Sequence, residues 1–323
     1  MKDGFGRTTD YLRISLTDKC NLRCTYCMPE EGIRGLKHEE ILSLEETAFL
    51  AGIFNSLGIR RIRLTGGEPL VRKNAVWLVN KLSNSCDLDE LCMTTNAALL
   101  RENAKALKAA GLDSLNVSLD TLSEKTFKEI TGQEGLPEVL QGIEEAKKQG
   151  FKVKLNCVLL KGVNDTEVEE LVRFADRNMV DIRFIELMPI GCGAGLCGIS
   201  NDDLLESLEK SFGKADKNIQ HGDRGPALYY SFPSLGSRIG LISPMSHKFC
   251  DKCNRLRLTA DGFLKLCLQY PDGVDLKRPL RNGAGEEELK SLIREAVLKK
   301  PACHSFFENS SQKDNRKMIQ IGG

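Results

Sequence analysis

Short β-rich runs alternate with helical patterns between residues 11 and 188, and this alternation limits the fold more than any other feature of the sequence. We expect strands at Tyr11–Thr17, Arg61–Thr65, Leu91–Thr95, Ser114–Leu119, Lys152–Leu160 and Asp181–Met188. Apolar residues at helical spacing predict intervening helices at Ser43–Leu57, Ala75–Leu82, Leu99–Ala110, Leu136–Gln149 and Thr166–Asn178. Repeated strand–helix units indicate an α/β fold with a parallel sheet, either flat and doubly wound or curved into a barrel.

Several helix ends are marked by residues suited to that position. Ser43 is a suitable N-cap for the first helix, because its hydroxyl can accept from a free backbone amide. Gly58, Gly111 and Gly150 each follow a helical run, where a C-cap favours glycine. These residues support the expected helix boundaries.

The pattern changes after residue 213, where short strand signals replace the strand–helix units. The expected strands are Leu228–Phe232, Arg238–Ser243, Arg255–Thr259 and Phe263–Leu268. Asp261-Gly262 predicts a hairpin turn, and a final helix is expected at Glu286–Leu298. We therefore divide the chain into residues 1–213 and a β-rich C-terminal extension over residues 214–323.

The composition is that of a globular protein. Hydrophobic residues make up 41% and charged residues 28% of the 323 residues. No apolar run approaches the roughly 18 residues that span a bilayer, and the N-terminus lacks the regions of a signal peptide. The net charge of +1 does not suggest a general nucleic-acid-binding surface. We expect a cytoplasmic protein that binds neither membranes nor nucleic acid.

The first of two cysteine groups follows the first expected strand. Cys20, Cys24 and Cys27 have the spacing C-x₃-C-x₂-C, and grouped cysteines in a reducing compartment indicate metal ligands. Three thiolates that hold a four-iron cluster leave one iron open to a small molecule. Structural zinc is the alternative, but it prefers four ligands, and His38 is eleven residues beyond Cys27.

The second cysteine group flanks the expected C-terminal hairpin. Cys250, Cys253 and Cys267 have the spacing C-x₂-C-x₁₃-C. They predict a second cluster with an open iron that could take a substrate nitrogen or oxygen. Because His247 precedes them by three residues, their spacing leaves a Cys₃His zinc site open as well.

The other six of the twelve cysteines are scattered, and packing is the simplest interpretation for most of them. They are Cys86, Cys92, Cys157, Cys192, Cys197 and Cys303. Cys192 and Cys197 lie in the Gly-rich segment Pro189–Gly198, which could form a substrate wall or bind a further metal. The role of this segment is left open.

Basic residues lie on or beside the expected strands, at Arg13, Arg63, Lys154 and Arg183. Inward-facing charges in a barrel need a partner, because burying an unpaired ion is costly. A nucleoside triphosphate would neutralise them, since arginine binds phosphate through paired hydrogen bonds. The alternative is that they face outward or pair with acids such as Glu186.

Taken together, the motifs resemble those of one enzyme family. Tyr26 precedes Cys27, and Gly66-Gly67-Glu68-Pro69 follows the second strand, as in the radical S-adenosylmethionine superfamily. Further matching segments are Gly6-Arg7, Tyr11-Leu12-Arg13, Cys27-Met28-Pro29, Lys161–Asp165, Ile239–Ser243, Phe249–Thr259 and the terminal Gly322-Gly323. Over essentially the whole chain the sequence resembles the GTP 3′,8-cyclase family of molybdenum cofactor biosynthesis. Ala97 stands where that family usually has glycine.

The resemblance implies a partial (βα)₆ barrel whose extension carries the second cluster. It implies two [4Fe–4S] clusters, held by Cys20, Cys24, Cys27 and by Cys250, Cys253, Cys267. It implies S-adenosylmethionine contacts at Tyr26, Gly67, Ser118 and Met188. It implies GTP contacts at Arg13, Arg63, Thr94, Lys154, Arg183, Arg255, Leu256 and Arg257, with catalytic roles for Arg257, Gly322 and Gly323.

The implied reaction is a radical cyclisation of GTP to (8S)-3′,8-cyclo-7,8-dihydroguanosine 5′-triphosphate. The 5′-deoxyadenosyl radical removes the ribose 3′ hydrogen, and the sugar radical attacks guanine C8. Expected partners are an electron donor, the downstream cyclic pyranopterin monophosphate synthase and a second copy of the chain. The alternatives are a peptide-modifying radical enzyme, which usually has a longer cysteine-rich extension, and a non-catalytic zinc scaffold.

Overall fold

One curved sheet organises the protein, whose computed structural model describes residues 1–218, 225–306, 314 and 316–322. The first strands are β1 (Tyr11–Ser15), β2 (Arg61–Thr65), β3 (Glu90–Thr95), β4 (Ser114–Ser118), β5 (Lys152–Val158) and β6 (Asp181–Ile185). The later strands are β7 (Asp216–Lys217), β8 (Leu228–Ser231), β9 (Ile239–Ile242), β10 (Arg255–Leu258), β11 (Phe263–Lys265) and β12 (Gly273–Asp275). Within the described residues the strand order is β12-β11-β10-β1-β2-β3-β4-β5-β6-β9-β8-β7.

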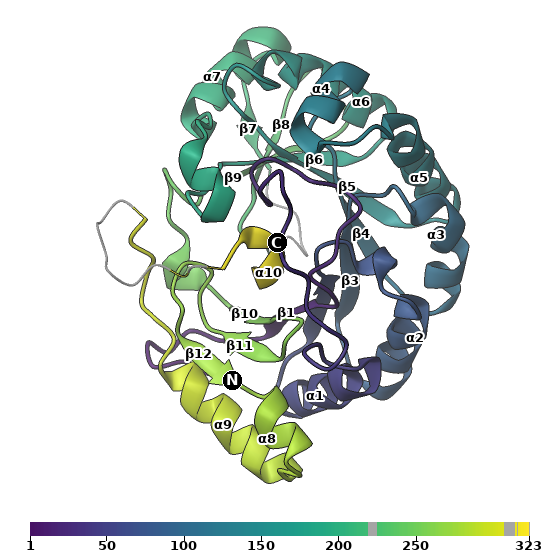
Figure 1. Cartoon of the computed structure of the whole chain (residues 1–323). Helices are drawn as coiled ribbons and strands as arrows, with labels where there is room; N and C mark the ends of the chain where they lie inside the picture. The colour runs from purple at the N-terminus through teal and green to yellow at the C-terminus, as the bar shows by residue number, and fades with distance from the viewer. Residues whose placement is uncertain (219–224, 307–313, 315, 323) are drawn as a thin grey trace.

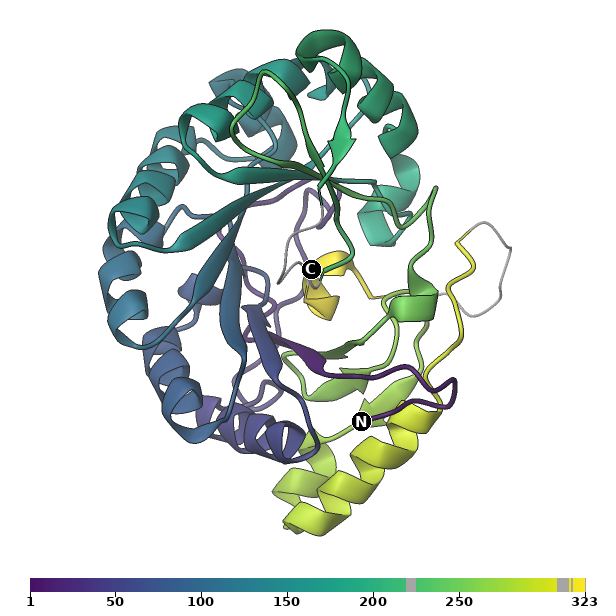
Figure 2. The ribbon, with the colours of Figure 1, turned by 180° about the vertical axis from the view of Figure 1, so that it is seen from behind.

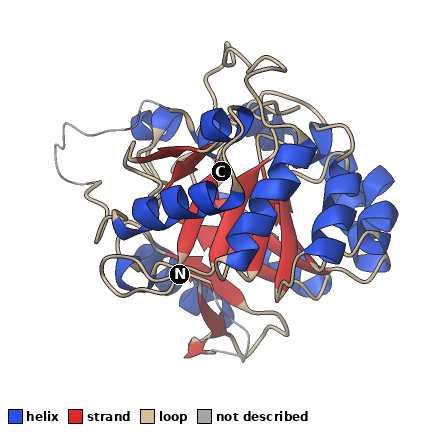
Figure 3. Cartoon of the chain, turned by 90° about the horizontal axis from the view of Figure 1, so that it is seen from below, coloured by secondary structure: helices blue, strands red, loops and turns tan. Residues whose placement is uncertain are grey.

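Helices surround this sheet as an outer layer (Figure 1). The α-helices of the described residues, only some of which belong to this layer, are α1 (Leu44–Ser56), α2 (Ala75–Ser85), α3 (Leu100–Ala109), α4 (Glu124–Thr131), α5 (Leu136–Lys148), α6 (Val168–Arg177), α7 (Asn201–Phe212), α8 (Lys277–Arg281), α9 (Glu286–Leu298) and α10 (Met318–Ile321). Figures 1 and 2 show α1 to α7 around the outside of the strands and the short α10 inside the ring. In Figure 3 the strands, in red, lie between helices, in blue.

The helix-facing side of the parallel strands is apolar. Alternate residues on these strands belong to the apolar core, and most of them are at most 1% exposed: Leu12, Ile14, Ile62, Leu64, Leu91, Met93, Leu115, Val117, Leu155, Ile182, Phe184, Leu256 and Leu258. Burying each such side chain stabilises the fold by about 1.5–3 kcal/mol. The intervening residues face the inside of the ring, because successive side chains on a strand alternate between its faces.

All six strands expected in the first part are confirmed, with ends that differ by at most three residues. The five expected helices are confirmed as α1, α2, α3, α5 and α6. Gly58, Gly111 and Gly150 end helices with φ of 95°, 93° and 74°, which glycine adopts without steric cost. Two further helices of the first part, α4 and α7, were not predicted, and neither were the short α8 and α10 of the extension.

The C-terminal extension adds strands to both edges of the barrel sheet. β10 pairs in parallel with β1, and β9 pairs in parallel with β6. Antiparallel strands continue each edge, with β11 and β12 beyond β10 and β8 and β7 beyond β9. The partial barrel with a β-rich extension is confirmed. The division at residue 213 remains a prediction, and the two parts share one sheet.

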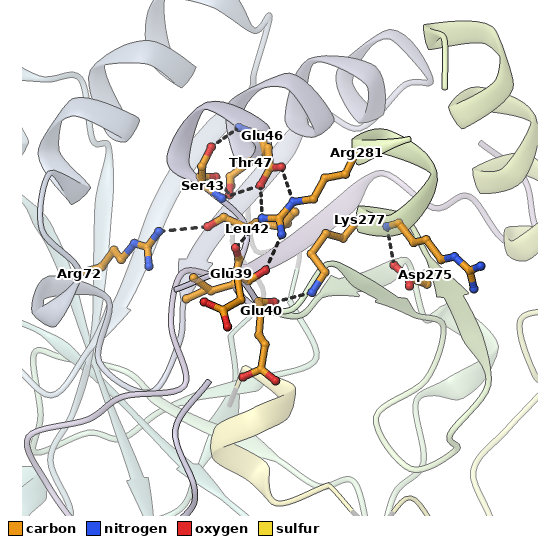
Figure 4. Close-up of polar contacts among 12 residues, drawn as sticks. Glu39, Glu40, Leu42, Ser43, Glu46, Thr47, Arg72, Asp275, Lys277 and Arg281 are labelled. Carbon is orange, nitrogen blue, oxygen red and sulfur yellow. Dashed lines mark hydrogen bonds and ion pairs between the residues drawn. The ribbon is translucent and has the colours of Figure 1, made fainter. Parts of the chain in front are cut away.

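A polar contact network joins α8 to the start of α1 (Figure 4). Arg281 donates from Nε to Glu46 Oε1 at 2.7 Å and from Nη2 to Glu46 Oε2 at 2.9 Å. Glu46 also accepts from the Ser43 amide at 2.7 Å as part of a capping box. Lys277 Nζ donates to Glu40 O at 2.6 Å, and Arg72 Nη2 donates to Leu42 O at 3.0 Å. These contacts fasten the extension to the barrel.

No helix in the described ranges is long and apolar enough to cross a membrane.

Candidate active site

The inner face of the sheet carries a row of arginines. Arg257, Arg13 and Arg63 occupy the same register position on β10, β1 and β2, so their side chains are neighbours on one face. Thr94 and Lys154 share a second row across β3 to β5, and Arg183 lies on β6. Barrel interiors are usually filled by branched apolar side chains, so this inner face is suited to binding an anion.

Burial and mutual repulsion disfavour the positive charges of Arg13 and Arg257, whereas at Arg63 the Tyr11 side chain more than offsets burial and raises the pKa. Burial lowers the pKa of Arg13 to about 10, and Arg63 and Arg255 add to the effect. Burial, Arg13 and Arg255 lower the pKa of Arg257 well below its ordinary value. Such shifts mean that a nearby anion would stabilise the charged form of these two guanidinium groups.

Arg63 and Lys154 each donate to a neutral hydroxyl group on this face. Arg63 donates to the Tyr11 hydroxyl and, at 3.5 Å, to Thr94 Oγ1. Lys154 Nζ donates to Tyr229 Oη at 3.1 Å. Within the described residues, Nε and Nη2 of Arg183 are buried without a hydrogen-bond partner.

Glu186, which could have paired with these arginines, has other partners. Its carboxylate accepts from the backbone amides of Asn201 at 3.0 Å, Met245 at 2.8 Å and Ser246 at 2.9 Å. It thereby ties the end of β6 to α7 and to the segment that leads to Cys250. The alternative in which Glu186 neutralises the arginine row is not supported.

The first cysteine group lies in the loop beyond the carboxyl end of β1. The amide of Leu22 contacts Cys20 Sγ at 3.4 Å, and Asn96 Nδ2 contacts it at 3.8 Å. Burial, with smaller contributions from Cys20 and Cys192, raises the pKa of Cys27 to about 12. Burial and the neighbouring Cys27 also raise the pKa of Cys24. The thiols are therefore close enough to repel one another as thiolates, a cost that a bound metal removes.

The Gly-Gly segment after β2 packs directly against this loop. A Cβ on Gly67 would lie 2.3 Å from Lys19 O, so only glycine allows the approach. The next residue, Glu68, is buried and accepts from Thr95 Oγ1 and from the Asn96 amide, both at 2.8 Å. Burial raises its pKa to about 7. Glu68 thus joins the cysteine loop region to the end of β3.

The second cysteine group lies at the other end of the same strands. Cys250 and Cys253 precede β10, which runs parallel to β1, and Cys267 follows the antiparallel β11. The arginine row in the middle of these strands therefore lies between the two groups. Burial opposes ionisation of Cys253, but Arg255 and Lys300 outweigh it and lower the pKa of the thiol to about 7.

Both cysteine groups have donors suited to iron–sulfur clusters. Among the described residues, no three His, Cys, Asp or Glu side chains are arranged to hold a single metal ion. Thiolates on a four-iron cluster bind different irons, so they do not need to converge on one point. His247 Nε2 hydrogen-bonds with Asp202 Oδ1 at 2.8 Å on the surface, which argues against a role in a Cys₃His zinc site.

Comparison with known proteins decides the family. Residues 14–175 match the family model described as the Radical SAM superfamily, and residues 180–306 match the one described as Molybdenum Cofactor Synthesis C. The GTP 3',8-cyclase of Clostridium perfringens (strain SM101 / Type A) is 42% identical over 327 residues, covering 100% of both chains. That of Peptoclostridium acidaminophilum is 46% identical, covering 99% of this chain and 98% of the relative. The chain belongs to the GTP 3′,8-cyclase family.

A solved structure supports the fold assignment for this GTP 3′,8-cyclase family member. Streptococcus suis SuiB bound to S-adenosylmethionine has a TM-score of 0.59 at 14% identity, covering 81% of this chain and 60% of that chain. The complex of SuiB with its precursor peptide SuiA has a TM-score of 0.60 at 15% identity, covering 97% and 76%. At this identity the likeness shows the fold alone. Membership of the radical superfamily implies one [4Fe–4S] cluster and S-adenosylmethionine.

The remaining predicted cofactor residues lie near strand ends, as expected for this family. Ser118 is the last residue of β4, and Met188 follows β6, where its carbonyl accepts from the Ile190 amide at 2.8 Å. Tyr26 Oη donates to Asp120 Oδ2 at 2.6 Å. Strand carboxyl ends are where barrels form their sites.

The C-terminal tail reaches the same end of the ring. Arg257 Nη1 donates to Gly322 O at 2.8 Å. A Cβ on Gly322, whose φ is 81°, would lie 3.0 Å from Ser15 Cβ and from Thr65 Oγ1. Ser15 and Thr65 are the last residues of β1 and β2. The tail therefore lies at the carboxyl ends of these strands, where the chain continues toward the first cysteine group. Gly323 lies outside the described residues.

Leu256 differs from the other predicted substrate residues. Its register partner is Leu12, and its fully buried side chain faces the outer helices rather than the arginine row. Only its backbone could contribute to a ligand site on the inner face. Its predicted role as a substrate contact therefore cannot involve the side chain.

Sequence reasoning missed several polar residues that shape the site. Asp120 is buried, accepts from Tyr26 and from the Val158 amide at 2.8 Å, and has its pKa raised by burial to about 6. Tyr11 and Tyr229 contact basic residues of the inner face. Asp120 could have been found because it follows the β4 strand directly, where parallel sheets place functional groups.

Proposed function

We propose that this chain is a radical S-adenosylmethionine enzyme that converts GTP to (8S)-3′,8-cyclo-7,8-dihydroguanosine 5′-triphosphate, the first step of molybdenum cofactor biosynthesis. The observation that carries the proposal is the arginine row of Arg257, Arg13 and Arg63 between two cysteine groups. Such a row is suited to a triphosphate, because guanidinium groups bind phosphate oxygens through paired hydrogen bonds.

Cys20, Cys24 and Cys27 would hold the cluster that binds S-adenosylmethionine, and Cys250, Cys253 and Cys267 a second [4Fe–4S] cluster that positions guanine. When bound, the first cluster and S-adenosylmethionine supply the radical that takes the ribose 3′ hydrogen. The chain's own part is to bind and orient. Tyr26, Gly67, Ser118 and Met188 would contact S-adenosylmethionine, with Asp120 fixing the Tyr26 hydroxyl.

GTP would be held on the inner face of the sheet. The contacts we propose are Arg13, Arg63, Thr94, Lys154, Arg183, Arg255, the Leu256 backbone and Arg257. The tail residues Gly322 and Gly323 and the guanidinium of Arg257 would assist catalysis, and the 2.8 Å contact from Arg257 to Gly322 O supports a shared role. Holding the ribose close to the radical source provides the orientation that the reaction needs.

The proposed setting is the cytoplasm, with an electron donor that reduces the first cluster. The product would pass to cyclic pyranopterin monophosphate synthase, and a homodimer is the expected assembly. These partners are inferred from the family.

The test is an anaerobic assay of the reconstituted protein with dithionite, S-adenosylmethionine and GTP. We expect formation of 5′-deoxyadenosine that depends on GTP and is much weaker with ATP or a random peptide. Transfer of deuterium from 3′-deuterated GTP into 5′-deoxyadenosine would identify the hydrogen that is removed. Equal 5′-deoxyadenosine formation with GTP, ATP and peptide would contradict the proposal.

A further inference from the structure

The segment Pro189–Gly198, which no motif explains, lies between two parts of the candidate active site. It leaves β6 through Met188 and contains the short 3₁₀ helix η3 (Gly191–Gly195). Its glycines make two close approaches, one toward the cysteine loop and one toward the C-terminal tail. These approaches give the segment a positioning role.

The first approach is made by Gly193 and is directed at the cofactor side. A Cβ on Gly193 would lie 2.6 Å from Met188 O and 3.6 Å from Tyr26 O. Real Cβ atoms are not found at the shorter distance, so any larger residue must displace the η3 turn or the Met188 carbonyl. Tyr26 and Met188 are both predicted to contact S-adenosylmethionine, and among the four predicted contacts they are the first and the last in the sequence.

The second approach is made by Gly191 and is directed at the tail. A Cβ on Gly191 would lie 3.2 Å from both Cα and Cδ of Lys317 and 3.6 Å from the Met318 amide nitrogen. Lys317 precedes α10, the short helix inside the ring, and Gly322 follows it. Gly191 also has a φ of 55°, a conformation that other residues rarely adopt.

Both ends of the segment are fixed, so the two approaches belong to one unit. At its start the Ile190 amide donates to Met188 O at 2.8 Å, and the Gly193 amide donates to Ile190 O at 3.0 Å. At its end Cys197 O accepts from the Lys161 amide at 2.9 Å, and Gly198 forms a bridge with Leu160. A shift at Gly193 must therefore move Gly191 as well.

We infer that the segment Pro189–Gly198 positions the C-terminal tail against the cofactor side of the site, with Gly191 and Gly193 as its two contact points. This inference rests on the proposed function, in which the tail takes part in the reaction. Met188 and Tyr26 bear on one side of the η3 turn, and Lys317 bears on the other. Displacement at one contact is transmitted to the other, so the tail is seated for catalysis only when the turn is in place.

The test compares three alanine variants in the same turn, using the cluster-loaded, anaerobically purified protein. Gly191→Ala and Gly193→Ala each add a Cβ into a close contact, whereas a Cβ on Gly195 meets nothing within 4 Å. Gly195→Ala is therefore the matched control. The first readout is hydrogen exchange of the amides in residues 318–322, which reports seating of the tail without any turnover. The second readout is the amount of cyclised product per 5′-deoxyadenosine.

We expect Gly191→Ala to speed exchange in residues 318–322 about tenfold, because it strains the backbone and displaces Lys317. Gly193→Ala should speed the same exchange severalfold although Gly193 does not touch the tail. Gly191→Ala and Gly193→Ala should both lower the ratio of cyclised product to 5′-deoxyadenosine. Gly195→Ala should match the unchanged protein in both readouts. Gly191→Asn tolerates positive φ but still adds a Cβ, so faster exchange in that variant assigns the effect to the contact. Iron content equal to that of the unchanged protein verifies folding.

Unchanged tail exchange in Gly193→Ala would overturn the transmission between the two contacts. Unchanged exchange in both Gly191 variants would overturn the positioning of the tail. The exchange readout does not depend on turnover. If the unchanged protein fails to cleave S-adenosylmethionine in response to GTP, the proposed function fails, while the exchange data still decide whether the segment seats the tail.

Discussion

Cys20 and Cys24 lie beside carboxylates, whereas Cys253 lies beside cations. Burial is the largest cause of the raised pKa of Cys20; Glu68 raises it further, and the Leu22 amide and Arg23 only partly oppose this. Burial, Cys27 and Asp120 raise the pKa of Cys24. Burial also acts to raise the pKa of Cys253, but Arg255 and Lys300 outweigh it, so the pKa of this thiol is lowered.

The difference shows how one ligand type can serve two sites. When ionised, the Glu68 and Asp120 carboxylates would favour a ligand that carries positive charge beside the first cysteine group, such as the sulfonium and ammonium groups of S-adenosylmethionine. Cations near the other group favour thiolates and, along the arginine row, a triphosphate. The two ends of the strands are thus electrostatically matched to ligands of opposite charge.

The largest expected effect separates the two cysteine groups by function. Cys24→Ala should reduce all 5′-deoxyadenosine formation by roughly three orders of magnitude or more, because the radical source is lost. Cys253→Ala should retain some cleavage of S-adenosylmethionine and lose cyclisation. Chromatography of 5′-deoxyadenosine and of the cyclised nucleotide distinguishes the two variants. Cys197→Ser is the control, because Cys197 is exposed. Equal losses of both products in the two variants would contradict the division of labour.

The next effect tests the arginine row. Arg257→Ala should lower cyclisation roughly a hundredfold, because a half-buried charged group that contacts the tail, and that we propose contacts substrate, would contribute a few kcal/mol. Initial rates of product formation measure this, with Arg60→Ala as the control, since Arg60 pairs with Asp87 on the surface. Full turnover by Arg257→Ala would reject its assigned role.

A third prediction concerns the carboxylates of the first region. Burial raises the pKa of Glu68 from 4.5 to about 7. Between these values the folded chain keeps a proton that the unfolded chain has released, so stability falls as the pH rises from 4.5 to 7. Glu68→Gln should remove about 2 kcal/mol of this fall.

Urea unfolding of the cluster-free protein at several pH values measures that change. Burial also raises the pKa of Asp120, to about 6. The stability of the Glu68→Gln variant should therefore still fall as the pH rises, but by less than that of the unchanged protein. Parallel pH curves for the variant and the unchanged protein would show that the pKa of Glu68 is the same in the folded and the unfolded chain, and would contradict the prediction.

The smallest effect concerns the attachment of the extension that carries the second group. Arg281→Ala should lower the free energy of unfolding by about 1 kcal/mol, because its ion pair with Glu46 is partly exposed. Urea unfolding checks this, and Arg278→Ala on the same helix is the control. A loss equal to that of a core substitution would mean that the network in Figure 4 has a larger structural role.

The strands and most helices of the barrel could be predicted because their signals are local. Alternation on Arg61–Thr65 and caps such as Ser43 are set by neighbouring residues. Pairing of distant strands is not local, so the sequence did not indicate that β9 and β10 join opposite edges of the sheet. The helix α7 was missed although Ser200 caps it, because it directly follows the Gly-rich segment.

The candidate site shows the same limit. Cysteine spacing and the positions of the arginines could be taken from the sequence, since both lie on predicted strands or loops. The hydrogen-bond partners of the buried acids could not be predicted from the sequence. Glu186 accepts from backbone amides rather than from an arginine, and Asp120 accepts from Tyr26, which is 94 residues away in the chain. Which face Leu256 presents depended on the register with β1.

The most direct test of the two-group account is the iron and sulfide content of the protein purified without oxygen. Two four-iron clusters predict about eight irons and eight sulfides per chain. Replacing either triad, Cys20, Cys24 and Cys27 or Cys250, Cys253 and Cys267, by alanine should leave about four of each. A content of about four in the unchanged protein, or zinc without sulfide at the second group, would contradict the account.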